Sequence, residues 1–515
     1  MKKIFNPPLW LLAITLSLAF FFRFYKFETI PFGLNHDGAQ DALQAIDLLQ
    51  HPLPYKPYFT GGSGETLFKY YLGGIIKIFG PGVRTIKFGS TLLCFLTIPA
   101  FYLMVKEISG QKHALLATFL FSISGWHITM GKTVWRAIST PLFEVVTLYF
   151  LIKAAKNSHW AGYLLSGFFL ALTLNTYSAA RSLPIFVMFF LLGDFFKKIK
   201  EKKPLLKIIP YYLIFFVIFS ITIFPLANYA KNNWTEFNSR LGTLSVFTRI
   251  KDEGNFTPLM TNFKKTFLIF NVKAGGDDFF TTQPLLDFPA SWLFILGIII
   301  CLVKPSKSVN LFALAGLGVN LLPGLISTPN GNRNIATMPF VYLISGIGLL
   351  SLWDFFRPLF KTKGVFLTLF ILGCLLGTIK TYLLYFGPNR RELWGFYPET
   401  TIVGNFIKPL TDKYDFYLTD NYPRDALTFL TYQGGNPYEK HYQWLEKKEY
   451  FPLAEPSGKG MIFIMFNTPK NQLFIPKLKQ TFPGGYISEL RYLNGNINRS
   501  AALFYIIEKG KLYEK

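Results

Sequence analysis

Long apolar runs recur along most of this chain, and they constrain its fold more than any other feature. At roughly 20 residues for one membrane crossing, the sequence predicts about eleven spans. With hydrophobic residues at 51% of the composition, the runs exceed what a soluble core would need. We therefore expect a mainly α-helical, polytopic membrane helix bundle. The expected spans lie near residues 8–25, 85–105, 114–130, 138–153, 161–176, 183–197, 208–228, 289–303, 309–326, 335–353 and 365–386.

The distribution of the basic residues indicates membrane orientation. The formal net charge is +24, but the lysines cluster in short segments between apolar runs, such as 197–207, and not along one basic face. When the spans alternate, these segments fall on one side, which is the cytoplasm. We therefore expect a multi-pass protein of the cell membrane with a cytoplasmic N-terminus and no nucleic-acid partner. The polar-rich connections then face outward: 26–84, 130–137, 177–182, 229–288, 327–334 and the residues from 387.

The sequence divides into two expected parts. Residues 1–386 are expected to form the transmembrane catalytic domain, with interfacial helices in the first outer loop, 26–84, and a second long outer loop at 229–288. From residue 387 the apolar runs shorten to strand length, which predicts a small extracytoplasmic α/β domain over 387–515.

Carboxylates beside the first apolar run are the strongest candidates for a reaction centre. The stretch from Leu34 to Leu43 carries Asp37 and Asp41, and charged groups held against a bilayer are costly. A helix here would place the two carboxylates on one face, because positions four apart are neighbours. A second interfacial helix from Glu65 would bring Lys69 one turn away, where the ordinary alternative is a surface salt bridge.

Each of three short outer turns brings at least one cation to the membrane surface. Lys132 and Arg136 lie on the first turn, Arg181 on the second and Arg333 on the third. Because arginine at outer span ends opposes the usual bias, these side chains call for an anionic partner. The alternative for each of them is to extend toward lipid phosphates.

No metal site is indicated by the sequence. The three cysteines fall inside apolar runs, and Asp277-Asp278 fits a solvated turn better than a metal site. No cofactor is therefore required, and a divalent metal stays an open alternative that no ligand spacing supports.

In order and spacing, these features resemble the GT-C glycosyltransferases, in particular the protein O-mannosyltransferase and lipid A aminoarabinose transferase group. The resemblance covers about residues 1–350. Many relatives have an Asp-Glu pair where this chain has Asp37-Gly38, which leaves open whether Asp41 or Glu65 supplies a second carboxylate. The resemblance is carried by 36–42, 64–72, Ile78-Phe79-Gly80 with Arg84, Trp126-His127-Ile128 with Arg136 and Pro141, 176–184 and 333–339.

The resemblance implies an interfacial active site that uses a polyprenyl-phosphate sugar. We expect a hexosyl or pentosyl transferase that moves the sugar, with inversion, to an extracytoplasmic hydroxyl of a glycan, lipid or protein. Asp37 would be the general base or orient the acceptor, and Glu65 would position the acceptor or one of the cations. The expected phosphate-binding residues are Lys69, Lys132, Arg136, Arg181 and Arg333. Further pocket candidates are His36, His127 and Tyr177.

Two other functions remain open. A transporter or flippase for lipid-linked glycans would need charges or broken helices near the membrane midplane, whereas the charges here lie at one face. A polymerase or ligase acting on lipid-linked glycans would be distinguished by a multi-sugar product.

Overall fold

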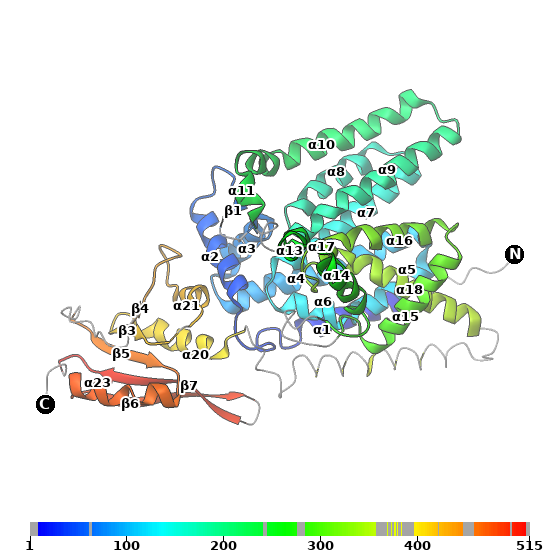
Figure 1. Cartoon of the computed structure of the whole chain (residues 1–515). Helices are drawn as coiled ribbons and strands as arrows, with labels where there is room; N and C mark the ends of the chain where they lie inside the picture. Colours follow the sequence, from blue (N-terminus) through cyan, green and yellow to red (C-terminus); the bar gives the residue numbers. More distant parts are fainter. Residues whose placement is uncertain are drawn as a thin grey trace. The chain divides into compact units, whose positions relative to one another are not determined.

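The computed structural model in Figure 1 describes residues 9–60, 64–239, 245–274, 284–356, 396–420, 422–445, 458–494 and 497–510, with the single positions 368, 372, 375, 376, 379 and 383. The chain is mainly helical with a small C-terminal sheet, which confirms the predicted fold class. By their contacts the residues form two units. The first unit comprises Met1–Phe27, Leu53–Tyr70 and Lys87–Tyr385, and the second comprises Glu28–Pro52, Tyr71–Ile86 and Phe386–Lys515.

The first unit is a bundle of helices (Figure 1). Helix α3 (Leu67–Phe79) runs from the first unit into the second, and the first residues of α4 belong to the second. The helices are α1 (Leu9–Phe24), α4 (Val83–Ser109), α5 (Gln111–Ser122), α6 (Gly125–Lys132), η1 (Arg136–Ile138), α7 (Ser139–Asn157), α8 (Trp160–Leu174), η2 (Ser178–Ser182), α9 (Leu183–Lys200), α10 (Leu205–Asn232), α11 (Trp234–Phe237), α13 (Val246–Glu253), α14 (Thr257–Leu268), α15 (Phe288–Val303), α16 (Ser308–Asn320), α17 (Leu322–Ile326), η3 (Ile335–Thr337) and α18 (Met338–Phe356).

Several of these helices can cross a membrane, so the chain is a multi-pass membrane protein. Among the described residues, 6 helices are long and apolar enough to span, or 7 if the bent pair α5 and α6 is one span. Three shorter apolar helices, α1, α8 and α15, also lie where spans were expected. The expected number of eleven is not confirmed: the predicted span 114–130 is bent by 55° between α5 and α6, and 365–386 falls almost wholly outside the described residues.

A buried arginine from α1 stabilises the break between α5 and α6. The break interrupts the regular hydrogen bonds of the helix, so the last carbonyl groups of α5 need other donors. Arg23, which is 0% exposed, donates to the carbonyl oxygens of Ser122 at 2.6 Å and Phe121 at 3.3 Å. On the other side of the break, the Ser124 hydroxyl accepts a hydrogen bond from the backbone N–H of His127 and so caps α6. The charged residue in the span therefore has a structural function.

The second unit contains a five-stranded sheet in the order β4-β3-β5-β7-β6. Strand β3 pairs in parallel with β4 and β5, whereas β7 pairs antiparallel with β5 and β6. The strands are β3 (Tyr414–Leu418), β4 (Gln443–Trp444), β5 (Gly460–Met465), β6 (Tyr486–Asn494) and β7 (Ile497–Ile507). The short helices are α20 (Pro398–Ile407), η5 (Lys408–Leu410), α21 (Arg424–Thr431), α22 (Pro469–Gln472) and α23 (Ile475–Thr481).

Alternation along the strands gives this sheet two buried faces. Phe416 and Ile462 pack with Val403 of α20 and Leu427 of α21 on one face. Their neighbours in the strands point the other way and pack with Leu478 of α23. Because successive side chains of a strand point to opposite faces, helices cover the sheet on both sides, as expected of an α/β domain.

Helix α2 (His36–Gln50) packs against α21 within the second unit. His36 Nδ1 lies 3.5 Å from Asp425 Oδ2 at one end of α2, and the Gln50 side-chain amide donates to the carbonyl of Gly435 at the other. Gly33 precedes the helix with φ +101°, and a Cβ atom there would lie 2.0 Å from the Phe396 carbonyl oxygen. Only glycine fits this approach, so the entry to α2 is fixed against the C-terminal residues.

The same packing raises the pKa of a tyrosine, Tyr438. Burial, with the carboxylates of Asp47 on α2 and Asp425 on α21 nearby, raises the pKa of Tyr438 to about 12. C-terminal residues therefore contact both ends of α2, although more than 350 residues separate them from it in the sequence.

Replacing Arg23 with methionine is expected to lower the stability by about 2 kcal/mol, because two buried carbonyl groups lose a charged donor. The measurement is the midpoint of thermal unfolding of the purified protein in detergent. The control is Arg84→Met, since that guanidinium is exposed and pairs with Glu28 at 2.9 Å, where a loss below about 1 kcal/mol is expected. Equal midpoints for the two variants would contradict the structural function of Arg23.

Candidate active site

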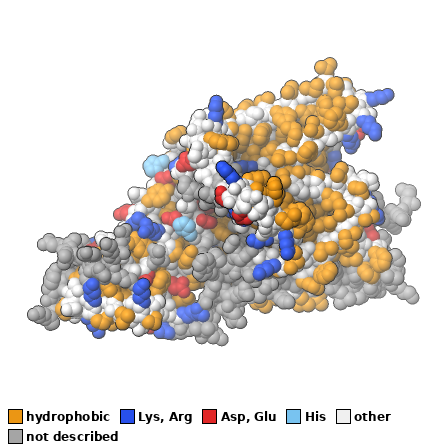
Figure 2. Space-filling model, in the orientation of Figure 1, with side chains coloured by type: hydrophobic (Ala, Val, Ile, Leu, Met, Phe, Trp, Pro, Cys, Tyr) orange, Lys and Arg blue, Asp and Glu red, His pale blue; other side chains and the backbone are white. Residues whose placement is uncertain are grey.

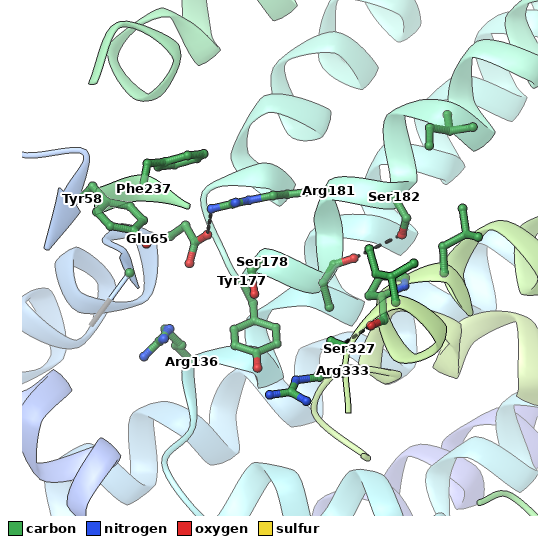
Figure 3. Close-up of a pocket in the computed structure, with 16 residues that line it drawn as sticks. Tyr58, Glu65, Arg136, Tyr177, Ser178, Arg181, Ser182, Phe237, Ser327 and Arg333 are labelled. Atoms are coloured by element: carbon green, nitrogen blue, oxygen red, sulfur yellow. Dashed lines mark hydrogen bonds and ion pairs between the residues drawn. The ribbon is translucent and has the colours of Figure 1, made fainter. Parts of the chain in front are cut away.

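A cavity of about 270 Å³ in the first unit gathers three arginines and one carboxylate (Figure 3). Its walls come from the strands at 58–59 and 64–65, from η1, η2, α9, α11 and α17, and from the turn after α17. The lining residues are Tyr58, Gly64, Glu65, Arg136, Tyr177, Ser178, Ala179, Arg181, Ser182, Ile185, Phe237, Leu322, Pro323, Ile326, Ser327 and Arg333.

Glu65 reaches the cavity from a short hairpin. Strands β1 (Tyr58–Phe59) and β2 (Gly64–Glu65) pair antiparallel, with Tyr58 opposite Glu65. The Glu65 side chain is 2% exposed, and its Oε1 lies 2.8 Å from Nη2 of Arg181. The centre of the Phe237 ring lies 4.1 Å from the Arg181 guanidinium carbon, so Arg181 also contacts an aromatic side chain. Charge pairing and the aromatic face together fix the direction of this arginine.

The hairpin corrects the predicted helix start. Residue 65 is in a strand and α3 begins at Leu67, because the segment pairs with 58–59 before the helix. The alternative of a surface salt bridge between Glu65 and Lys69 does not fit, because both residues are buried. The Glu65 carboxylate binds Arg181. Lys69 is buried and donates from Nζ to the backbone oxygen of Glu65 at 3.1 Å.

Arg136 and Tyr177 form the next wall of the cavity. The Arg136 guanidinium carbon lies 5.6 Å from the centre of the Tyr177 ring. Gly64 has φ +69°, and a Cβ atom there would lie 3.2 Å from Nη2 of Arg136. Glycine therefore allows both the backbone turn and the close approach of the arginine.

Arg333 enters from the turn after α17. Its Nη1 donates to the Thr328 carbonyl oxygen at 2.6 Å, and its backbone N–H donates to Oδ1 of Asn330 at 2.9 Å. In the view of Figure 3, Tyr177 lies between Arg136 and Arg333. Five residues expected from the sequence thus line one cavity: Glu65, Arg136, Tyr177, Arg181 and Arg333.

Three other expected residues do not line this cavity. Lys69 is placed as described above. Lys132 is buried at the end of α6 and donates from Nζ to the Tyr25 carbonyl oxygen at 2.6 Å. His127 is buried against Phe121, with ring centres 4.5 Å apart, and its Nδ1 lies 2.8 Å from Nη2 of Arg23.

The remaining expected residues, His36, Asp37 and Asp41, lie on α2 in the second unit. The Asn35 side chain caps the helix by accepting from the backbone N–H of Gly38. Asp37 is in the first turn, where the helix dipole favours a negative charge, and it is partly exposed. Asp41 is fully buried on the inner face of α2, so the two carboxylates differ in access to a substrate.

Sequence reasoning missed Tyr58 and Phe237 as lining residues. Tyr58 stacks on Tyr229 with ring centres 5.2 Å apart, which holds the hairpin beside the end of α10. Neither ring belongs to a periodic apolar pattern, and their neighbours appear only when distant segments pair. The available signal was the presence of aromatic residues in otherwise polar segments between the expected spans.

A metal centre is not evident in the part of the chain that the structure describes. No group of three or more His, Cys, Asp and Glu side chains there could hold an ion. Asp277-Asp278 falls outside the described residues.

The fold of this chain is a known one. The chain has the GT-C fold of integral-membrane glycosyltransferases, which confirms the resemblance seen in the sequence. Residues 66–224 match the model of the dolichyl-phosphate-mannose-protein mannosyltransferase family. A search of curated proteins found no match.

Solved structures are similar over nearly the whole chain. ArnT from Cupriavidus metallidurans, bound to undecaprenyl phosphate, has a TM-score of 0.58 at 11% identity, covering 98% of this chain and 99% of that one. An Archaeoglobus fulgidus oligosaccharyltransferase tethered with an acceptor peptide has a TM-score of 0.53 at 14% identity, covering 95% and 69%. The oligosaccharyltransferase AglB of the same organism, in complex with an inhibitory peptide and a dolichol-phosphate, has 0.51 at 13%, covering 96% and 74%.

Gly64→Ala is expected to destabilise the protein by about 1 kcal/mol, because an L side chain is strained at positive φ. The added methyl group would also displace Arg136 from its place in the cavity. The matched control is Gly74→Ala in α3, where no atom lies within 4 Å of the new Cβ; this change is expected to be neutral or stabilising. Thermal unfolding of both variants in detergent measures the difference, and the same sign for both would refute the prediction.

Proposed function

We propose that this protein is a membrane glycosyltransferase that moves a sugar from a polyprenyl-phosphate donor to an acceptor hydroxyl. The observation that carries the proposal is the cavity in which Arg136, Arg181 and Arg333 meet, with Glu65 as the one lining carboxylate. The forked donors of a guanidinium match the oxygens of a phosphate, and three guanidinium groups line this cavity.

The arrangement of the arginines supports phosphate binding. A guanidinium has five N–H donors, so the bond from Arg181 to Glu65 and the bond from Arg333 to Thr328 leave donors for a ligand. These bonds also fix the side chains before a ligand arrives, which lowers the entropic cost of binding. Structures with this fold have been solved with undecaprenyl phosphate and with a dolichol-phosphate.

Asp37 is the carboxylate that we assign to the acceptor. A general base must reach the proton that it removes, and Asp37 is partly exposed whereas Asp41 is buried. In the proposed reaction, Asp37 takes the proton of the acceptor hydroxyl as its oxygen attacks the anomeric carbon. The bond from that carbon to the donor phosphate breaks, and the arginines stabilise the negative charge of the leaving phosphate. One displacement inverts the anomeric centre.

The proposed location of the reaction is the outer side of the cell membrane. The support is the placement of the basic segments, which assigns the turns carrying Arg136, Arg181 and Arg333 to the side opposite the lysine-rich loops. The acceptor would then be an extracytoplasmic glycan, lipid or protein. No step requires a metal, so transfer is expected to continue with a chelator present.

Asp37→Asn is expected to lower kcat by about 10²- to 10⁴-fold, because the acceptor loses its base. The measurement is transfer of radiolabelled sugar by the purified protein in lipid, from a panel of synthetic polyprenyl-phosphate monosaccharides, with and without chelator. The control is Asp47→Asn on the same helix, whose carboxylate pairs with His51 at 3.3 Å. Near-normal transfer by the Asp37 variant would show that Asp37 is not the general base. If the folded wild type transferred sugar from none of the donors, a transporter or flippase would be favoured.

Arg333→Gln is expected to lower kcat/KM about 10- to 100-fold, because a hydrogen bond to a charged group contributes about 1.5–3 kcal/mol. The kcat/KM of Arg333→Lys should lie between those of the wild type and Arg333→Gln, since lysine keeps the charge and loses the forked contact. Arg491→Gln in β6 is the control, because that arginine pairs with Glu489 on the C-terminal sheet. The same transfer assay measures all three, and an Arg333→Gln enzyme as active as the control would exclude Arg333 from phosphate binding.

A further inference from the structure

Helix α14 buries its polar face and exposes its apolar face, whereas a helix on the surface of a water-soluble domain does the opposite. Its apolar side chains point outward: Met260 is 68% exposed, Phe263 50% and Phe267 58%. Its polar Asn262 and Thr266 are buried, at 1% and 0%. Positions three and four apart share a helix face, so the three exposed apolar residues form one stripe.

The apolar surface continues beyond α14. Phe247 on α13 and Phe256 before α14 are also exposed. Figure 2 shows hydrophobic side chains over this part of the molecule with basic side chains beside them. Aromatic rings left in water over several turns would be unfavourable, and a continuous apolar patch of this kind marks a contact surface.

The charges around the patch indicate what it contacts. Lys264 and Lys265 are exposed on α14, Lys251 lies on α13, and Lys273 follows α14. Aromatic and aliphatic residues on one side with lysines beside them are typical of helices that lie in a membrane interface. The lysine stems can extend so that their ammonium groups reach lipid phosphates.

The inner side of α14 is attached to the wall of the cavity. The Asn262 side-chain amide donates to the carbonyl oxygens of Leu325, at 3.0 Å, and of Ser327. Arg249 of α13 donates from Nη2 to Oδ1 of Asn262 at 3.2 Å. Ser327 lines the cavity, so the buried polar face of α14 holds the cavity wall while the apolar face points away.

We propose that α13 and α14 form an interfacial anchor, with Met260, Phe263 and Phe267 among the acyl chains of the phospholipid bilayer. Lys264 and Lys265 lie at the level of the phosphate groups. The sequence assigned this segment to a long outer loop, and the reversed amphipathicity puts it in the membrane surface instead. The proposal goes beyond sugar transfer and does not depend on it, because the lipid contact exists whether or not the protein turns over a donor.

The test uses a fluorescent label at one position of the full-length protein. Phe263→Cys carries a nitrobenzoxadiazole label, and Thr261→Cys is the matched control, exposed on the same helix about 200° around its axis. Each variant is reconstituted into vesicles of phosphatidylethanolamine and phosphatidylglycerol, in which part of the lipid carries a nitroxide on the acyl chain. Wild-type protein taken through the labelling gives the blank for the native cysteines.

We expect the nitroxide lipid to remove most of the fluorescence at position 263 and little at 261, whereas iodide in the water should do the reverse. Equal quenching by iodide at both positions would place the stripe in water and overturn the proposal. Protection of position 263 from both quenchers would show a second copy or a partner protein on the stripe and would also overturn it. Met260→Cys, on the same stripe, replaces Phe263→Cys if that variant does not fold.

Discussion

A cation that lies inside or beside the hydrocarbon of a membrane must find oxygen acceptors, and much of this structure follows from that requirement. Arg23 finds them at the carbonyl groups that the break after α5 exposes, and Lys132 finds one at Tyr25. Arg181 is paired with Glu65. At the cavity, Arg136 and Arg333 join Arg181 around that single carboxylate. We propose that these arginines bind an anionic ligand there.

Much of the cavity could be predicted from the sequence because of how spans alternate. Turns that connect every second pair of spans meet on one side of a bundle, so arginines at 136, 181 and 333 were expected near one another, and they line one cavity. The position of Glu65 depended on something else. Its strand exists only because residues 58–59 pair with 64–65, and a two-residue strand has no periodicity that a sequence can display.

Other features depend on the medium or on distant contacts. The stripe at Met260, Phe263 and Phe267 has the spacing of any amphipathic helix, and that spacing does not tell a core from a lipid layer. Which face of α14 points outward becomes clear only from the structure, where the Asn262 side chain donates to the Leu325 carbonyl oxygen on the inner side. Likewise Lys132 and His127 fit the motif of the expected site, yet both are buried among backbone carbonyls, rings and Arg23.

The packing of α2 on α21 joins segments that are far apart in the sequence into one structural unit. Residues 28–52, 71–86 and 386–515 form one unit, with Gly33 against Phe396 and His36 beside Asp425. A chimera that exchanged only the C-terminal residues with those of a relative would present α2 with a foreign surface, however well each half was built. An exchange of this unit between such proteins therefore has to move residues 28–52 and 71–86 together with the C-terminal residues.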